Sequence, residues 1–293
     1  MQYKGCNMQQ FLHMRTTFFV VSMIGLVLLV CMIYVSRTRK TYPGFHYWTA
    51  SSIFYFLGNI LIGLRGALPD FVTIVVANVV VSATFFMIPY GLGTFAERRH
   101  PFWPYLLTLA GVGVVVYYFT FISPSISHRI VVMSGVFAIS TVYALIIFKM
   151  TIPSFLNGSN LLLVVTLSGG TFWSLVRMIY TLLYEQDIDS FLTASVIQNA
   201  SVIIYCGLYT FVCFGLCVLN FQRVEHDLLK ARDDVKALEG ILPICSSCKK
   251  IRDDKGYWNQ VESYIRAHSD ATFSHSICPE CMKKIYPGYH RKS

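Results

Sequence analysis

Long apolar runs recur along most of this chain, and they limit its possible folds more than any other feature. Each run is about 17 to 25 residues long, enough for one helix to cross a hydrocarbon layer about 30 Å thick. The runs lie near residues 17–36, 47–64, 71–94, 102–122, 129–148, 160–182 and 191–219. With 55% hydrophobic and 13% charged residues, the chain also lies outside the usual composition of soluble domains. The sequence therefore predicts an all-α seven-helix transmembrane bundle over residues 1–220.

The basic residues in the short loops predict how this bundle is oriented, because lysine and arginine concentrate on the cytoplasmic side of a membrane. The loops after the first, third and fifth runs carry Arg37, Arg39, Lys40, Arg98, Arg99 and Lys149. The loops after the second and fourth runs carry the basic residues Arg65 and Arg129, and the loop after the sixth carries no basic residue but Glu185, Asp187 and Asp189. We expect the first run to be an uncleaved anchor with the N-terminus outside, and the C-terminus to be cytoplasmic.

Two cysteine pairs in the polar tail, residues 243–293, predict a metal site. Cys245 and Cys248 form one C-x-x-C pair, and Cys278 and Cys281 form another. A reducing cytosol disfavours disulfides, and four thiolates at this spacing are typical of a closed, structural Zn²⁺ site without catalytic function. Iron is the nearest competitor, but rubredoxin-like knuckles usually have glycine where this chain has Lys249. An exchanging redox dithiol is a weaker alternative.

His275 lies three residues before Cys278 and leaves one alternative open at this site. It could replace one cysteine as a ligand, lie behind the ligands, or be a surface or packing residue. We take the four cysteines as the complete set of ligands.

The residues between the cysteine pairs predict a small α+β module of the zinc-ribbon or treble-clef type. Residues 249–252 and 256–258 are expected to pair as a hairpin around the turn residues 253–256. Asn259 with Glu262 resembles a capping box at the start of a helix. Pro279 suits the first position of a second short helix that ends before Pro287.

Residues 221–242 link the last apolar run to the tail and carry a heptad pattern. Its apolar positions are Val224, Leu228, Ala231, Val235, Leu238 and Leu242. This spacing predicts a coiled-coil helix that joins two chains as a homodimer through residues 224–242. The alternative is an amphipathic helix that lies on the inner leaflet, in contact with membrane lipid, or packs on a neighbouring element.

A few polar residues inside the apolar runs are candidate ligand contacts, because polar groups are costly in hydrocarbon. The candidates are Arg177, Asn78, Gln198 and Asn199. Arg177 could instead pair with Glu185 or extend to the outer interface, and the amides could simply join helices.

We expect no enzyme activity. The run 191–219 has no lysine for a retinal Schiff base, no carboxylate lies at mid-membrane depth, and H-E-x-x-H is missing. The net charge of +9 follows from the loop bias and the basic tail, so we expect no nucleic-acid partner.

The tail also resembles a known kind of module. The stretch PICSSCKKIRDDKGYW, continuing to FSHSICPECMKKIYP, resembles a cysteine-rich tail at the C-terminus of many bacterial signalling proteins, behind PAS, GAF or receiver domains. This resemblance covers residues 242–287. In span count and loop style, the membrane part is similar to the seven-helix sensor regions of bacterial diguanylate cyclases and histidine kinases. The chain itself has no G-G-D-E-F motif, kinase half or PAS-sized segment.

These resemblances imply a multi-pass protein of the bacterial inner membrane and a cytoplasmic signalling partner. We therefore expect a sensor or receptor in which the seven helices detect a ligand or membrane state, the linker helix transmits it, and the zinc module engages the partner. The alternative is a small transporter or channel with a regulatory zinc-binding tail. Transport would be favoured by inverted internal repeats, and none is visible between residues 47–122 and 129–219.

Overall fold

The computed structural model describes residues 4–98, 101–152, 161–185, 196–239, 243–253, 256–268, 272–274 and 276–286. The chain forms two compact units, Met1–Asp227 and Leu228–Ser293. Their boundary falls inside the linker that the sequence placed at residues 221–242.

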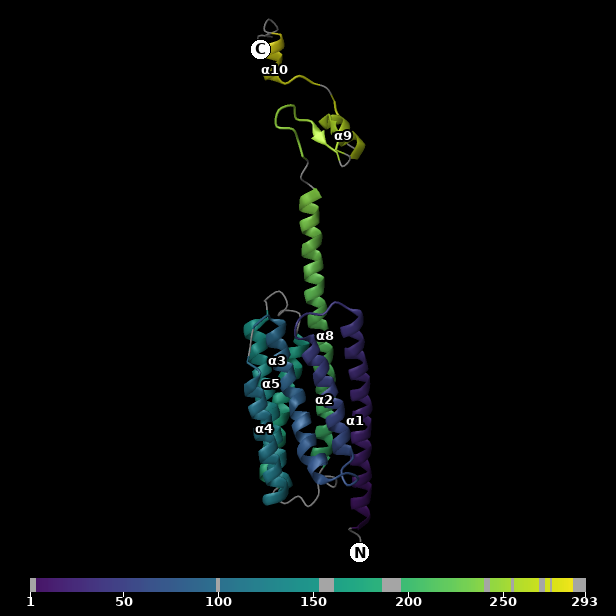
Figure 1. Ribbon diagram of the computed structural model, residues 1–293, viewed down its shortest axis with the longest axis vertical. Coiled ribbons are helices and arrows are strands. Elements are labelled where there is room, and N and C mark those ends of the chain that lie inside the picture. The colour runs from purple at the N-terminus through teal and green to yellow at the C-terminus, as the bar shows by residue number, and fades with distance from the viewer. Residues whose placement is uncertain are drawn as a thin grey trace. The chain divides into compact units, whose positions relative to one another are not determined.

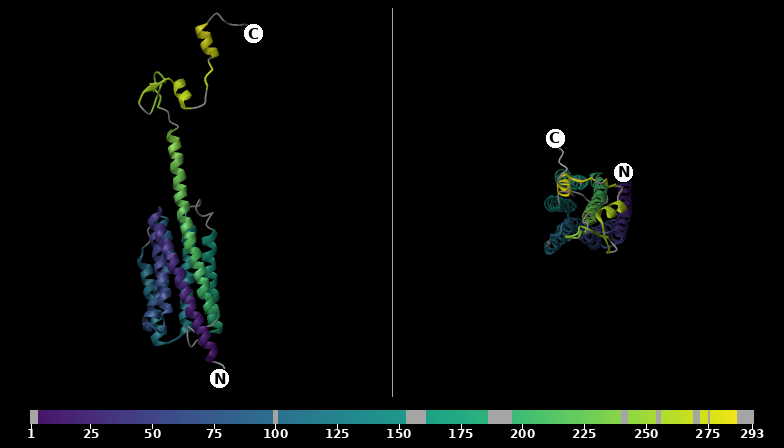
Figure 2. Two further views of the ribbon diagram at one scale, coloured as in Figure 1. Left: turned by 90° about the vertical axis from the view of Figure 1, so that its right-hand side faces the viewer. Right: turned by 90° about the horizontal axis from the view of Figure 1, so that it is seen from above.

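The first unit is a bundle of long helices that run side by side (Figures 1 and 2). Its elements are α1 (Lys4–Thr38), α2 (Phe45–Gly63), the π-helical η1 (Phe71–Val76), α3 (Ala77–Phe95), α4 (Trp103–Tyr117), the π-helical η2 (Tyr118–Ile122), α5 (Ile126–Thr151), α7 (Leu161–Tyr184) and α8 (Val196–Glu239). Neighbours along the chain pack together: α2 lies against α1 and α3, and α5 lies against α3 and α7.

Six segments within the described residues are long and apolar enough to cross a membrane, which is the composition of a multi-pass membrane protein. They are Met14–Thr38, Phe71–Phe95, Trp103–Ile122, Ile126–Met150, Leu161–Tyr184 and Val196–Arg232. The segment that the sequence counted in addition is α2. Its 19 residues include His46, two serines and Asn59, which lower its hydropathy. Six of the seven predicted spans therefore have the length and composition of a span.

The core of the bundle explains why α2 nevertheless forms a buried helix. Trp48 and Phe45 are each 1% exposed, and the polar Ser51, Ser52 and Asn59 are also buried between helices. His46, in the first turn, is exposed. Tyr55 stacks on Tyr209 of α8 with ring centroids 4.1 Å apart. The Tyr209 hydroxyl also meets the Ser51 hydroxyl at 2.9 Å, which satisfies both buried groups.

Helix α8 is longer than the sequence suggested. The last apolar run and the linker were expected as separate segments, whereas the structure has one helix of 44 residues from Val196 to Glu239. The stretch from 216 to 239 contains no glycine or proline, so no residue breaks the helix at the predicted boundary.

The tail unit contains the elements that its turn residues predicted. Strands β1 (Ile251–Arg252) and β2 (Trp258–Asn259) pair antiparallel, with Ile251 opposite Asn259. Helix α9 (Val261–His268) follows, and α10 (Pro279–Ile285) begins at the predicted proline. The expected capping box differs in one respect, because the Asn259 side chain donates to Asp253 in the hairpin turn at 2.8 Å.

Candidate functional site

A cavity of about 110 Å³ lies inside the bundle, between α1, α2, η1, α3, α5, α7 and α8. Most of its wall is apolar, with Phe85, Phe137 and Met133 among the lining side chains. Its polar lining residues are Asn59, Arg65, Asn78, Arg129, Arg177 and Tyr205. None of the described residues around the cavity is a carboxylate. The cavity therefore combines three guanidinium groups with an apolar wall.

Arg177 is the buried member of this arginine group, at 7% exposure. Its Nε donates to the Gln198 Oε1 at 2.8 Å, and its guanidinium carbon lies 5.8 Å from the centre of the Tyr205 ring. The side chain therefore turns inward, and the alternative of extension to the membrane interface is not realised. The alternative of pairing with Glu185 is realised only indirectly, because the Gln198 Nε2 donates to the Glu185 Oε2 at 2.6 Å.

Arg65 and Arg129 complete the arginine group and come from different parts of the chain. Arg65 follows α2, and Arg129 lies in the first turn of α5, where its NH1 donates to Thr120 at 3.2 Å. Burial and, to a lesser extent, the positive charge of Arg129 lower the pKa of Arg65 to about 10, although exposed Asp70 acts in the opposite direction. Sequence reasoning missed both residues because it used them only as loop charges.

The candidate amides have different places around the cavity. Asn78 lines it and donates from Nδ2 to the Ile74 carbonyl at 2.6 Å. Gln198 is fully buried, and its Oε1 accepts the hydrogen bond from the Nε of Arg177. Asn199 is not among the lining residues, and its Oδ1 is buried without a hydrogen-bond partner in the described part of the chain. The structure thus brings together three of the four candidate ligand residues.

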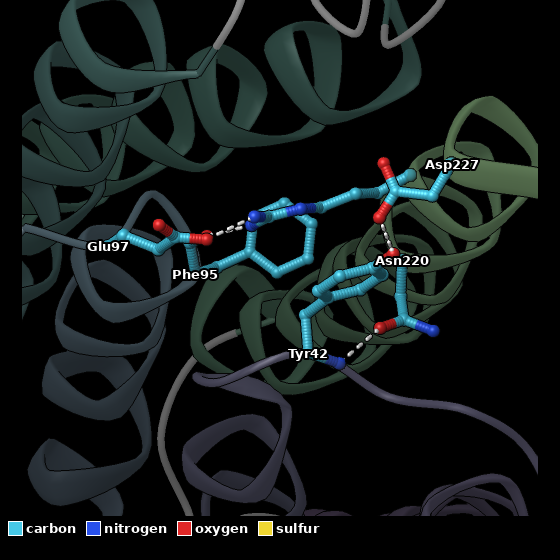
Figure 3. A network of polar contacts seen from close by, with 6 residues as sticks. Tyr42, Phe95, Glu97, Asn220 and Asp227 are labelled. Carbon is cyan, nitrogen blue, oxygen red and sulfur yellow. Dashed lines mark hydrogen bonds and ion pairs between the residues drawn. The ribbon is translucent and has the colours of Figure 1, made fainter. Parts of the chain in front are cut away.

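A second cluster of polar contacts joins α8 to two loops of the bundle (Figure 3). We call this cluster the α8 clamp. It consists of Tyr42, Phe95, Glu97, Asn220, Arg223 and Asp227. Tyr42 lies between α1 and α2, Phe95 and Glu97 lie at the end of α3, and the other three residues are on α8.

Arg223 is the centre of the α8 clamp. It donates to the Phe95 carbonyl and pairs with the Glu97 carboxylate. Its guanidinium carbon also lies 4.2 Å from the Tyr42 ring centre and 5.1 Å from that of Phe95, which are cation–π distances. Glu97 has a φ of 60°, an unusual conformation for a residue with a Cβ.

Two further side chains fasten α8 to the loop between α1 and α2. The Tyr42 hydroxyl donates to Asp227, while the Tyr42 amide donates to the Asn220 Oδ1 at 3.1 Å. Asn220 in turn donates to the Lys40 carbonyl at 3.1 Å. Burial first, then the hydrogen bond to Asp227, raises the pKa of Tyr42 to about 12. The hydroxyl therefore keeps its proton at every physiological pH, and the clamp is not a pH switch at this contact.

Each cysteine pair of the tail lies in a short hydrogen-bonded turn, and we call the two pairs half-sites because each would supply two of the four predicted thiolates. In the first pair, the Lys249 amide donates to the Cys245 carbonyl at 2.9 Å, and Lys249 has a left-handed φ of 59°. In the second, Cys278 caps α10 and its Sγ accepts from the Cys281 amide. Amide groups that point at the sulfurs lower the pKa of Cys245 and of Cys278, which favours the thiolate that a metal needs.

The structure does not join the two half-sites. In the described ranges, no three His, Cys, Asp or Glu side chains are close enough to share a metal ion, and the four cysteines of the two pairs are free thiols. His275 lies outside the described residues. The residues of each half fit zinc by their chemistry, so zinc remains a prediction that needs the pairs to close on one ion.

Leu228 is an exposed apolar residue of the predicted dimer seam. It is 68% exposed on α8, where a packed core leucine would be buried. The side chains of Val235 and Leu238, and the whole of Leu242, are outside the described residues. The seam is therefore compatible with a partner helix, but the dimer stays a prediction.

Comparisons with known proteins give no further guide to this site, since no family model, curated protein or solved structure matches the chain.

Proposed function

We propose that the protein is a receptor of the bacterial inner membrane that passes a change in its helical bundle through α8 to a cytoplasmic tail. In this proposal α2 also crosses the membrane, which brings the number of spans to seven. The observation that carries the proposal is the continuity of α8. This single helix provides Gln198 beside the cavity, Arg223 in the α8 clamp, and Leu228 beyond it.

A continuous helix is a suitable transmitter because it moves as a stiff element. A small shift or rotation at one end is carried along it, as in the helix shifts of known switching proteins. In this proposal α8 has two states: one in which the contacts of the α8 clamp to Tyr42 and Phe95 are made, and one in which they are broken. Coupling needs a two-state element of this kind.

The tail is the proposed output of the receptor. Cys245, Cys248, Cys278 and Cys281 would bind one Zn²⁺ and stabilise a module too small to support itself. The metal would supply structure and no chemistry. The folded module would then present a surface to a cytoplasmic signalling protein, and two modules would be joined through residues 224–242.

Photo-crosslinking in the full-length protein tests the transmission. A photoreactive amino acid at Leu228 is expected to join two chains, whereas one at Lys230, outside the seam, should do so much less. Arg223→Gln breaks the α8 clamp and should change the yield at Leu228. Arg37→Gln, an exposed arginine outside both the clamp and residues 224–242, should leave the yield unchanged.

Two results would count against the receptor. If Arg223→Gln folds normally, as judged by gel filtration, and the yield at Leu228 stays the same, the clamp does not control α8. If the positions 228 and 230 react equally, the heptad seam does not join two chains. Uptake of solute by liposomes that contain the protein would favour a transporter instead.

A further inference from the structure

We propose that the arginine cavity binds a small organic anion, whose charged head lies among Arg65, Arg129 and Arg177 and whose apolar body lies against the aromatic wall. This inference rests on the receptor function proposed above, because it names the class of ligand to which the bundle would respond.

The charges argue for an anion. Arginine within a membrane-spanning bundle is costly unless it is paired, and such residues mark binding sites or ion paths more often than structure alone. Three guanidinium groups line one cavity that has no described carboxylate in its wall. Glu185 is reached only through Gln198, and Asp70 is exposed. A bound anion would offset the mutual repulsion of the arginines.

The geometry of arginine narrows the head group. A guanidinium is a planar fork that matches carboxylate or phosphate with two parallel hydrogen bonds. The Nε of Arg177 is already held by Gln198, which fixes the plane of the group before any ligand arrives. Asn59 and Asn78 add amide groups to the same wall. Carboxylate and phosphate esters share the required chemistry.

The volume and wall limit the body of the ligand. A cavity of about 150 Å³ in another protein takes up benzene, and this cavity of about 110 Å³ is somewhat smaller and partly polar. Phe85, Phe137, Met133 and Tyr55 offer an apolar and aromatic surface. The body of the ligand is therefore at most a single ring or a short chain, and a whole lipid tail is too large.

The site is also placed to influence α8. Val202 and Tyr205 of this helix line the cavity, and Tyr205 meets Ser174 of α7 at 3.0 Å. Gln198, one turn earlier, holds Arg177. An anion that draws Arg177 toward the head group therefore acts on α8 directly, through Gln198 and the Tyr205 ring.

Equilibrium binding of radiolabelled benzoate to the full-length protein in lipid nanodiscs tests the proposal. We expect saturable binding that phenyl phosphate displaces and that benzamide, the neutral analogue, does not. Inorganic phosphate should displace benzoate far less well than phenyl phosphate. Arg177→Gln should weaken binding by about tenfold or more, since it removes a charged hydrogen-bonding group.

Arg177→Lys serves as the conservative variant and should retain part of the affinity. Arg37→Gln, an exposed arginine outside the cavity wall, should bind benzoate as the unaltered protein does. The proposal is overturned by the absence of saturable binding, by equal binding of benzamide, or by unchanged affinity in Arg177→Gln. If inorganic phosphate displaces benzoate as strongly as phenyl phosphate does, the apolar wall does not contribute to binding, and that part of the proposal is refuted.

These outcomes are separate from those of the receptor proposal. The crosslinking test at Leu228 needs no ligand, so a clamp-dependent yield without benzoate binding would leave a receptor for another stimulus. Benzoate binding without any effect of Arg223→Gln would leave an anion site in a protein that does not signal through α8.

Discussion

Lys249 carries a conformation that its residue type does not favour. Its φ of 59° is left-handed, a region that costs a residue with a Cβ about 1–2 kcal/mol. The same position in rubredoxin-like knuckles usually holds glycine, and at the level of sequence the presence of lysine favoured zinc over iron. The structure nevertheless gives Lys249 this left-handed φ, and the Lys249 amide donates to the Cys245 carbonyl at 2.9 Å.

Substitutions of Lys249 should therefore separate backbone strain from side-chain chemistry. Lys249→Gly is expected to hold zinc as well as the native residue or better, because glycine adopts this φ without steric cost. Lys249→Val should lose zinc at a lower chelator concentration, since a β-branched residue is a clear outlier here. Zinc retained by the full-length variants in a chelator titration measures this. Equal retention by Gly and Val would mean that the turn opens when metal binds.

The arginines of the cavity show what a sequence can reveal at this scale. Arg177 is recognisable because it lies inside an apolar run, where a charge is costly. Arg65 and Arg129 lie at the ends of runs, where arginine is ordinary, so only their tertiary position shows that they share a cavity. One signal was present: both lie in loops expected to face away from the cytoplasm, where basic residues are scarce.

At the scale of elements, local signals were sufficient and long-range ones were not. The hairpin and α10 of the tail were predictable because turn residues and Pro279 act within a few residues. The α8 clamp was not, because Arg223 and Phe95 are far apart in sequence and their contact depends on how α3 packs beside α8. The two cysteine half-sites are likewise each local, and the zinc site that would join them remains a prediction.

If the two cysteine pairs bind one zinc ion together, the metal content of the full-length protein should show it. The full-length protein should contain one zinc per chain, and Cys248→Ser or Cys281→Ser should each abolish it, because a tetrahedral structural site needs all four thiolates. His275→Ala should keep the metal. Elemental analysis of purified protein provides the measurement. Zinc that survives in both serine variants would rule out the four-thiolate site, and loss in His275→Ala would make the histidine a ligand.

At the scale of the whole molecule, the basic residues of the loops relate the position of the cavity to the orientation of the protein in the membrane. Arg65 and Arg129 belong to loops that the charge rule places outside, and the cavity gives them a reason to be there. The α8 clamp belongs to the other set of loops, with Lys40 and Glu97. In this account, the ligand site faces the periplasm and the clamp faces the cytoplasm.

Reporter fusions test this orientation. A reporter that works only in the cytoplasm should be active when it is fused after Ser293. A reporter that works only in the periplasm should be active when it is inserted between residues 185 and 190. The reason is the alternation of basic and acidic loops, which requires α2 to cross the membrane. If both reporters lie on the same side, α8 does not span, and the tail cysteines need a different environment. Reporters in the loops on either side of α2, at residues 39–44 and 64–70, should lie on opposite sides, and the same side for both would show that α2 does not span.

Hydrogen exchange along the full-length protein, with and without benzoate, tests the central claim that occupancy of the bundle reaches the tail. At benzoate concentrations that saturate the cavity, we expect changed exchange both around the cavity and in residues 228–239 and 243–286. Arg177→Gln should remove both changes, and Arg223→Gln should remove only those beyond Asp227. Saturated binding with changes confined to the residues around the cavity would contradict the account, because the bundle would then sense an anion without passing the signal through α8.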